Sequence, residues 1–295
     1  MQPLEGQLVV DFTRQLPGPY ASRELLRLGA LVVKVEPPGG ESMREGAPAW
    51  YEAINAGKEI VCLDLKADGL AEAQALCDGA DVILDGFRPG VFDRLGLRVP
   101  EQAVYCAITG FGTEGRHALR AGHDINYMGW AGLLHDTAPA VPPTQVADLA
   151  AGALGALVEI LAALVERGRT GRGRRIVISM THGSHRLAAH RLGGDPLPKL
   201  LTGGPPCFRT YETGDGRHLT VGALEPKFWL RLCELIERPD LVERHYDPTA
   251  ADDLAEVFSG RTLADWLELF DDEDVCVGPV WTLEEAAAEF GAPSA

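Results

Sequence analysis

Short β-rich apolar runs alternate with segments of helical spacing through about the first 185 of the 295 residues, and this alternation constrains the fold most. Runs of strand character cover residues 7–12, 30–35, 60–65, 81–84, 104–108 and 175–179, with helical spacing over 20–28 and 70–77. Clusters of Gly and Pro join them by short links. Strand, helix, strand in this order is typical of parallel α/β units. The sequence therefore predicts a Rossmann-like, doubly wound parallel sheet.

The pattern changes after about residue 202. Residues 208–212 and 218–222 read as two strands joined by a turn with an Asp-Gly signal, and helical spacing follows over 227–236, 250–258 and 264–270. We expect a large α/β domain over 1–185, a linker over 186–204 and a smaller α+β domain over 205–295. The basic run 166–175 is interpreted as a polar turn before the last strand of the large domain.

Charge and targeting signals narrow the function classes. The net charge of −16 argues against nucleic-acid and anionic-membrane partners, so an anionic ligand needs a local basic patch. The N-terminus shows no signal-peptide pattern. The apolar stretch 149–165 contains Glu159, Gly152 and Gly155 and is predicted to be a core helix rather than a membrane span. Six scattered cysteines without metal-like spacing suggest reduced thiols in a cytoplasmic protein.

Several common catalytic and cofactor motifs are missing from the sequence. No G-x-G-x-x-G follows the first strand, which disfavours a dinucleotide site of the usual kind. There is no G-x-x-x-x-G-K-[ST] phosphate loop and no G-x-S-x-G nucleophile elbow.

Three residues are candidates for acid–base chemistry: His123, Asp148 and Glu225. One imidazole and two carboxylates suit the movement of a weakly acidic C–H proton. Each also has a plain structural interpretation: a surface histidine, a helix N-cap at Asp148, and an acidic residue before the helix that Pro226 opens. A helix dipole at Asp148 is expected to hold its carboxylate ionised.

The surrounding motifs resemble the class III coenzyme A transferase (CaiB/BaiF) superfamily over nearly the whole chain. They include Val9-Val-Asp-Phe-Thr-Arg14, Leu28-Gly-Ala-Leu-Val-Val-Lys-Val-Glu-Pro-Pro-Gly-Gly40, Gly86-Phe-Arg-Pro-Gly-Val-Phe-Asp-Arg-Leu-Gly96 and Ile108-Thr-Gly-Phe-Gly112. Within the superfamily, the α-methylacyl-CoA racemase branch is indicated by Gly122-His-Asp-Ile-Asn-Tyr127, Leu201-Thr-Gly-Gly-Pro-Pro206 and Val221-Gly-Ala-Leu-Glu-Pro226.

This resemblance implies roles for the three candidates. His123 and Asp148 would act as acid and base on opposite faces of a thioester α-carbon, and Glu225 would set the protonation of His123. Coenzyme A would enter only as part of the substrate, with no separate cofactor and no metal. The family also implies a homodimer.

The resemblance further implies which residues contact coenzyme A: Leu63, Asp64, Leu65, Lys66, Gly86, Phe87, Arg88, Arg94, Gly122, Asp124, Ile125, Asn126 and Tyr127. Read independently, Lys66, Arg88 and Arg94 are the kind of cations that a phosphate-bearing ligand requires in an acidic protein. Solvated surface charge is the plain alternative for each of them.

Two features depart from the family pattern. Family members usually continue beyond the position where this sequence ends, with a segment that returns to the large domain, so we expect the interlocking of the family's dimer to be altered or absent. His182, His185 and His190 also lie close together in the sequence. A polar segment at the inter-domain linker is the preferred interpretation, with a metal site as the alternative.

Three functional hypotheses follow. The first is an acyl-CoA racemase or epimerase that inverts the α-carbon of a 2-methylacyl-CoA thioester by two-base proton transfer. The second is a CoA-transferase in which Asp148 is a nucleophile that forms a mixed anhydride. The third is a non-catalytic protein that binds CoA esters.

Overall fold

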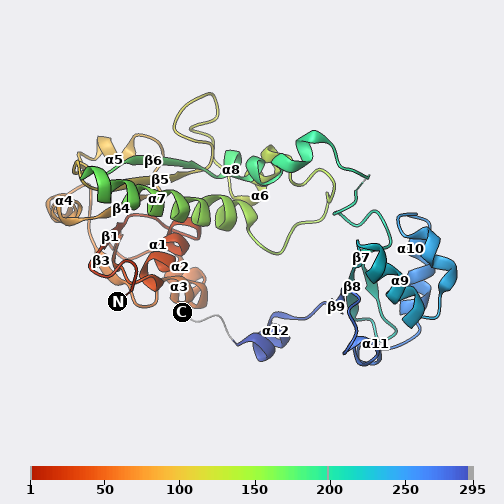
Figure 1. Ribbon diagram of the computed structural model, residues 1–295. Coiled ribbons are helices and arrows are strands. Elements are labelled where there is room, and N and C mark those ends of the chain that lie inside the picture. Colours follow the sequence, from red (N-terminus) through yellow and green to blue (C-terminus); the bar gives the residue numbers. More distant parts are fainter. Residues whose placement is uncertain (1, 198, 292–295) are drawn as a thin grey trace. The chain divides into compact units, whose positions relative to one another are not determined.

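The computed structural model describes residues 2–197 and 199–291. The chain divides into two compact units, one that runs up to His190 and one that begins at Arg191. Figure 1 shows the first unit in red to green and the second in blue-green to blue. The division falls inside the segment that the sequence analysis assigned to a linker.

The first unit is built on a six-stranded parallel sheet in the order β3-β2-β1-β4-β5-β6. Its strands are β1 (Leu8–Asp11), β2 (Leu31–Glu36), β3 (Glu59–Cys62), β4 (Val82–Asp85), β5 (Val104–Thr109) and β6 (Arg175–Ser179). The strand order reverses between β1 and β4, as in doubly wound folds. The predicted fold class is confirmed.

Helices cover both faces of this sheet (Figure 1). One apolar core lies between the sheet and α1 (Pro17–Arg27) and α7 (Gly155–Thr170), and the other lies under α4 (Gly69–Gly79) and α5 (Val91–Arg94). Successive side chains of a strand point to opposite faces, so Val9 belongs to the first core and Val10 to the second. Burial on both faces explains why the strands read as continuous apolar runs.

The first unit contains further short helices that the sequence analysis did not predict. They are α2 (Met43–Gly46), α3 (Pro48–Asn55), α6 (Asp124–Ala131) and α8 (Met180–Leu187). The π-helix η1 (Ala147–Leu154) leads into α7 and overlaps the stretch 149–165 that was predicted to be a core helix. The 3₁₀ helix η2 (Ala189–Gly193) crosses the division between the two units.

Two predicted boundaries in the first unit are wrong. Strand β3 stops at Cys62, because the following Asp64 turns the chain with its side chain, so Leu63 to Lys66 form a loop. Helix α7 continues to Thr170, so the polar turn predicted over 166–175 covers only the last part of that run. Gly171, with φ of +72°, ends the helix in the left-handed conformation that glycine adopts without steric cost.

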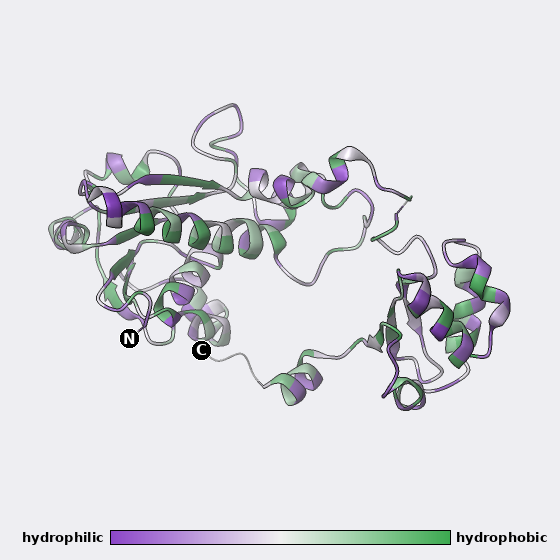
Figure 2. Cartoon of the chain, viewed as in Figure 1, coloured by the Kyte–Doolittle hydropathy of each residue, from purple (hydrophilic) through white to green (hydrophobic). Residues whose placement is uncertain are grey.

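The segment Ala147–Thr170, formed by η1 and α7, is the one helix within the described ranges long and apolar enough to span a membrane by length and composition. About a third of its most apolar window is buried. Ala153, Ala156 and Ile160 pack into the core over the sheet, while Val158 and Val165 are exposed. Figure 2 shows the apolar residues along α7. The buried side of the helix agrees with the predicted core helix.

The second unit is the predicted α+β fold. An antiparallel sheet in the order β7-β8-β9 is formed by β7 (Phe208–Glu212), β8 (His218–Gly222) and β9 (Val277–Pro279). Its helices are α9 (Pro226–Leu235), the 3₁₀ helix η3 (Pro239–Arg244), α10 (Ala250–Phe258), α11 (Leu263–Phe270) and α12 (Leu283–Phe290). The bounds of β6, β7, β8 and α10 match the prediction. An aromatic core around Trp229, Phe258 and Trp266 holds this unit together.

Candidate functional site

Three strands, β1, β3 and β4, end at or shortly before an aspartate that turns the chain at the carboxyl edge of the sheet. One oxygen of each carboxylate accepts the backbone N–H two residues further on, at 2.6–2.9 Å; the pairs are Asp11 with Thr13, Asp64 with Lys66, and Asp85 with Phe87. Such Asx turns fix short loops. Arg14, Lys66 and Arg88 lie in or directly after these turns. The repeated turn therefore brings three cations to one edge of the sheet.

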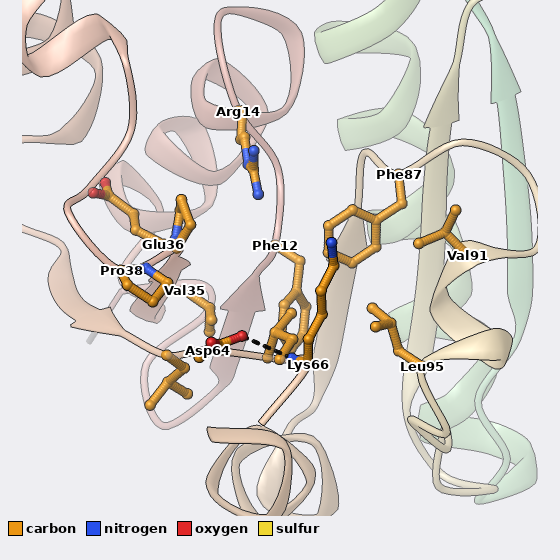
Figure 3. A pocket seen from close by; sticks show the side chains of 13 residues that line it. Phe12, Arg14, Val35, Glu36, Pro38, Asp64, Lys66, Phe87, Val91 and Leu95 are labelled. Atoms are coloured by element: carbon orange, nitrogen blue, oxygen red, sulfur yellow. Dashed lines mark hydrogen bonds between the residues drawn. The ribbon is translucent and has the colours of Figure 1, made fainter. Parts of the chain in front are cut away.

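A first cavity of about 380 Å³ opens over the ends of β1, β2 and β3. Among its lining residues are Leu63, Asp64, Leu65, Lys66 and Phe87, all of which the sequence analysis expected to contact coenzyme A. Figure 3 shows Arg14 and Lys66 reaching into this cavity from different sides. Glu36 also lines it, but that carboxylate already accepts hydrogen bonds from Arg44 and Tyr51. One oxygen of the Asp64 carboxylate accepts the backbone N–H of Lys66. The cavity therefore offers a ligand two cations and apolar walls, beside two carboxylates that already accept hydrogen bonds.

A second cavity of about 340 Å³ lies over the ends of β1, β4 and β5. Gly86, Arg88, Gly122 and Tyr127 of the expected CoA-binding residues line it, together with His123. Its lining also includes Arg14, Arg88 and Arg120, and no aspartate or glutamate is among the described residues that line it. Ligands of open α/β sheets bind where the strand order reverses, which here is the β1–β4 crevice.

The two cavities are neighbours. Arg14 and Phe87 line both of them, so the cavities form successive parts of one depression along the sheet edge. A ligand with a long, partly anionic body fits this arrangement better than a compact one.

His123 precedes α6 and has an extended backbone. Its backbone N–H donates to the side chain of Asn126 at 3.0 Å, which fixes the first turn of the helix. Two glycines let the ring of Tyr127 pack close by: a Cβ atom on Gly110 would lie 2.5 Å from that ring, and one on Gly122 would lie 2.8 Å from it. The Tyr127 hydroxyl donates to the Gly122 carbonyl at 2.5 Å. This packing places His123 on the wall of the second cavity.

Asp148 lies in the first turn of the π-helix η1 and is half-buried. The predicted N-cap role is wrong, because Val146 occupies that position. The backbone N–H of Asp148 donates to the Asp124 carboxylate at 2.9 Å. Burial and the Asp124 charge raise the pKa of Asp148 to about 6, and His123 acts in the opposite direction. The pKa of Asp148 therefore shifts in the direction opposite to the one expected from the helix dipole.

Small side chains around Asp148 allow the helices to approach closely. A Cβ atom on Gly152 would lie 3.1 Å from the Met180 side chain, and one on Gly183 would lie 2.8 Å from that of Ala151. The run of Ala and Gly after Asp148 thus lets α8 pack directly on η1. π-Helical turns often occur at functional sites. Here the turn carries the candidate carboxylate.

Glu225 belongs to the second unit, where it caps α9 without a side-chain hydrogen bond to the helix. Two hydrogen bonds fix the segment before it. His245 Nε2 hydrogen-bonds the Ala223 carbonyl at 2.8 Å, and the Tyr246 hydroxyl donates to the Leu224 carbonyl at 2.6 Å. These contacts fix Glu225 within its own unit. Its meeting with His123 stays a prediction.

Other predicted residues lie outside the two cavities. Arg94 ends α5 and lines neither of them, and neither do Asp124, Ile125 and Asn126. Asp124 and Asn126 instead hydrogen-bond Asp148 and His123, so they support the candidate acid–base pair. Within the described ranges, no three His, Cys, Asp or Glu side chains gather as a metal site.

Sequence reasoning missed Arg14 and Arg120. Arg14 ends the quoted motif that starts at Val9, and Arg120 comes three residues before His123. The sequence signal that could have identified these two arginines was their position in or next to the family motifs. Arg120 lies over the ring of Trp130, with 5.1 Å between its guanidinium carbon and the ring centre.

The fold and the site together define a doubly wound α/β protein with a cationic depression at its switch point. The chain belongs to CoA-transferase family III, which it matches over residues 4–292, and that family consists of enzymes that include racemases and CoA-transferases.

It is 34% identical to the α-methylacyl-CoA racemase of Homo sapiens, over 96% of this chain and 78% of the relative. It is also 31% identical to a probable fatty acyl-CoA transferase of Mycobacterium tuberculosis, over 95% and 83%. A CaiB/BaiF family protein of Brucella suis has a similar crystal structure, with a TM-score of 0.83 and 27% identity over 97% of this chain and 86% of that one. The predicted family is confirmed.

Proposed function

We propose that the protein is an acyl-CoA racemase or epimerase that inverts the α-carbon of a 2-methylacyl-CoA. His123 and Asp148 transfer the protons, and Glu225 assists by setting the protonation of His123. The single observation that carries this proposal is the placement of His123 on the cavity wall next to Asp124, whose carboxylate accepts the backbone N–H of the half-buried Asp148.

The raised pKa suits proton transfer. A general base or acid is most effective when its pKa lies near the working pH. Asp148 is ionised in most molecules at pH 7, yet it is far easier to protonate than an ordinary aspartate. A carboxylate of this kind accepts an α-proton on one pass and donates one on the next.

The reaction needs one base and one acid. The base removes the α-proton of the thioester and the C–H electron pair moves into an enolate. The acid on the other side returns a proton to the same carbon, which inverts it. After the turnover the base holds a proton and the acid has lost one, so exchange with water restores the pair. Arg120 and backbone N–H groups beside the cavity are available to stabilise the enolate oxygen.

Coenzyme A fits the depression in one direction. The adenosine occupies the first cavity, against Leu63, Leu65 and Phe87, and the pantetheine runs through the second cavity toward His123. Lys66 and Arg88 supply positive charge along this path. In a chain with a net charge of −16, this local gathering of cations supports an anionic ligand.

Deuterium exchange tests the proposal. The protein is incubated with a chiral 2-methylacyl-CoA in D₂O, and mass spectrometry and chiral analysis follow the label at C2. We expect incorporation of one deuterium together with loss of handedness. Absence of exchange above background, in a preparation shown to bind CoA esters, would contradict the racemase function.

A CoA-transferase is the second candidate. The half-buried Asp148 supports it, because this carboxylate lines neither cavity but interacts with His123 on the wall of the second one, and so does the transferase relative at 31% identity. In this reaction the Asp148 carboxylate attacks the thioester carbonyl and the C–S bond breaks. The CoA thiolate departs, and the acyl group remains on Asp148 as a mixed anhydride. The thiolate then attacks the Asp148 carbonyl of this anhydride, which releases the donor carboxylate and leaves a CoA thioester on Asp148. The acceptor carboxylate attacks that thioester and expels the thiolate, and the thiolate attacks the acceptor carbonyl of the second anhydride, which gives the acceptor-CoA and frees Asp148. Hydroxylamine converts such an anhydride to a hydroxamate, so a hydroxamate at Asp148 after incubation with acyl-CoA would favour the transferase over the racemase.

A further inference from the structure

Arg14 lies at the junction of the two cavities and lines both. Its side chain is exposed to the depression, as Figure 3 shows, and it has no carboxylate partner among the described residues. Lys66 lines the first cavity alone, and Arg88 lines the second alone. Arg14 is therefore the cation that any ligand spanning both cavities must pass.

The backbone on both sides of Arg14 is tied to one buried ion pair. Lys34 Nζ donates to the Thr13 carbonyl at 2.7 Å and lies 3.0 Å from Oε2 of Glu41. The other oxygen of Glu41 accepts the backbone N–H of Gln15 at 2.5 Å. The side chains of Lys34 and Glu41 are 0% and 2% exposed. One ion pair thus holds the carbonyl before Arg14 and the amide after it.

The hydrogen bond from Gln15 secures an unfavourable conformation. Gln15 has φ of +66°, in the left-handed region that residues with a Cβ atom rarely adopt. Without an acceptor in this position, the backbone would relax toward negative φ and swing Arg14 away from the junction. Glu41 supplies the acceptor, and Lys34 holds the Glu41 side chain in place.

We propose that Arg14 binds the diphosphate of the CoA ester and that the buried Lys34–Glu41 pair is a clamp that positions it. This inference rests on the proposed binding of CoA esters and adds to it a binding residue and two positioning residues.

The covalent order of coenzyme A selects the diphosphate. Adenosine, diphosphate and pantetheine follow one another, so a molecule with its adenosine in the first cavity and its pantetheine in the second carries the diphosphate across the junction. A guanidinium presents parallel N–H donors that match two phosphate oxygens. An apolar pair in place of Lys34 and Glu41 would fill the same space but would offer Thr13 no donor and Gln15 no acceptor.

Titration calorimetry with CoA and with dephospho-CoA tests the role of Arg14. Dephospho-CoA keeps the diphosphate and lacks the 3′-phosphate. We expect Arg14→Ala to weaken binding of both by about 10- to 100-fold, since a charge-assisted contact is lost. Arg169→Ala, an exposed arginine in the last turn of α7, is the matched control and should bind as the parent does.

Each of the other outcomes contradicts one part of the inference or of the proposed function. If Arg14→Ala and the parent bind CoA with equal affinity, the inference about Arg14 is wrong and the proposed binding of CoA is unaffected. Weakened binding of CoA with unchanged binding of dephospho-CoA assigns Arg14 to the 3′-phosphate and contradicts the diphosphate role. Failure of the parent itself to bind CoA removes the proposed function instead.

A double-mutant cycle tests the clamp. The paired replacement Lys34→Met with Glu41→Leu removes both backbone contacts without leaving a lone buried charge, so the protein is expected to fold. It should weaken CoA binding by about tenfold in the parent and not at all in the Arg14→Ala background. Equal losses in both backgrounds would mean a general structural effect and would refute the clamp. Should the double variant lose its thermal transition, Lys34→Met alone, which removes the donor to the Thr13 carbonyl, is carried through the same cycle under the same criterion.

Discussion

The two units of the chain treat charge in opposite ways. In the first unit, Lys34, Lys58 and Asp11 have fully buried side chains, and the two lysines bond to residues 13–19, which form the β1–α1 loop and the first turn of α1. In the second unit, ion pairs such as Arg231–Glu273 have side chains 29–43% exposed, and the core is aromatic and apolar. Both units are stable arrangements of similar elements, so folding alone does not require buried charge.

The difference indicates what the buried charges do. Removing a charge from water costs free energy that a salt bridge repays only with good geometry and further hydrogen bonds. In the first unit those hydrogen bonds go to the backbone: Lys34 to the Thr13 carbonyl and Lys58 to the Pro19 carbonyl. Both carbonyls bracket the loop that lines the second cavity. Buried charge therefore occurs where a loop of the candidate site is held.

The largest expected effect is on the rate of deuterium exchange, and it tests which unit contains the residues that transfer protons. His123→Ala and Asp148→Asn should each lower deuterium exchange by about 10²–10⁴-fold, the usual contribution of a positioned acid or base. Glu225→Gln should cost only about tenfold, because it acts through the protonation of His123. Exchange rates at saturating acyl-CoA measure this, and a loss for Glu225→Gln as large as for His123→Ala would break the assignment of proton transfer to the first unit.

Removal of one charged side chain should lower the free energy of unfolding more in the first unit than in the second. Lys58→Met takes a buried partner from Asp11 and donors from Pro19 and Asn55, so we expect a loss of about 3–5 kcal/mol in the free energy of unfolding. Arg231→Met, in a half-exposed pair, should cost less than about 1 kcal/mol. Urea unfolding followed by circular dichroism compares them. Similar losses for the two variants would remove the contrast drawn between the units.

The pH dependence of stability should have opposite signs at two aspartates. The pKa of Asp148 is raised from 3.8 to about 6, so the folded state binds the proton more tightly and stability falls as pH rises through that window. Asp148→Asn should therefore stabilise at pH 7, on the order of 2 kcal/mol, and give no gain below about pH 4.

Asp240 of the second unit provides the comparison. Its hydrogen bond with Arg238 lowers the pKa of this exposed carboxyl, so its contribution is present at neutral pH and fades as pH falls. Asp240→Asn should destabilise slightly at pH 7 and not in acid. Thermal melts from pH 3 to pH 8 record both variants, and a loss of stability for Asp148→Asn at pH 7 would contradict the raised pKa.

One small effect on stability should be the same in both units. Gly171 ends α7 with φ of +72°, and Gly216 turns the β7–β8 hairpin with φ of +73°; a Cβ atom at either would touch nothing within 4 Å. Each Gly→Ala change should cost about 1 kcal/mol, because only the backbone conformation is affected. Chemical denaturation of the two variants measures this. A clearly larger cost in one unit would show that its turn also depends on tertiary contacts.

Much of the fold followed from local sequence. Strand β6 and the β7–β8 hairpin match their predictions because apolar runs, alternation and the Asp-Gly turn are all local signals. Short helices such as α3 and α6 escaped prediction, since their stability comes from packing rather than from a long periodic pattern. The end of β3 was misjudged because the Asp64 turn competes with continuation of an apolar run.

The candidate site was also predictable from the sequence only in part. The residue types at His123, Asp148, Lys66 and Arg88 stood out through their motifs, and the structure brings Lys66 and Arg88 to the depression beside His123. Arg94 has the same residue type and lies outside both cavities. Whether a cation faces a ligand depends on its element's orientation, which no short motif specifies.

The sequence by itself determined the parallel sheet, the β7–β8 hairpin and the family, because short stretches of neighbouring residues specify each of them. Only the tertiary structure decided that Asp148 has a raised pKa and that Arg14 stands at the junction of two cavities. The first depends on burial and on the Asp124 charge. The second depends on Lys34 and Glu41 meeting around a loop that precedes them in the chain by about twenty residues or more. Electrostatics and clamping act through space, so they appear only when distant segments are brought together.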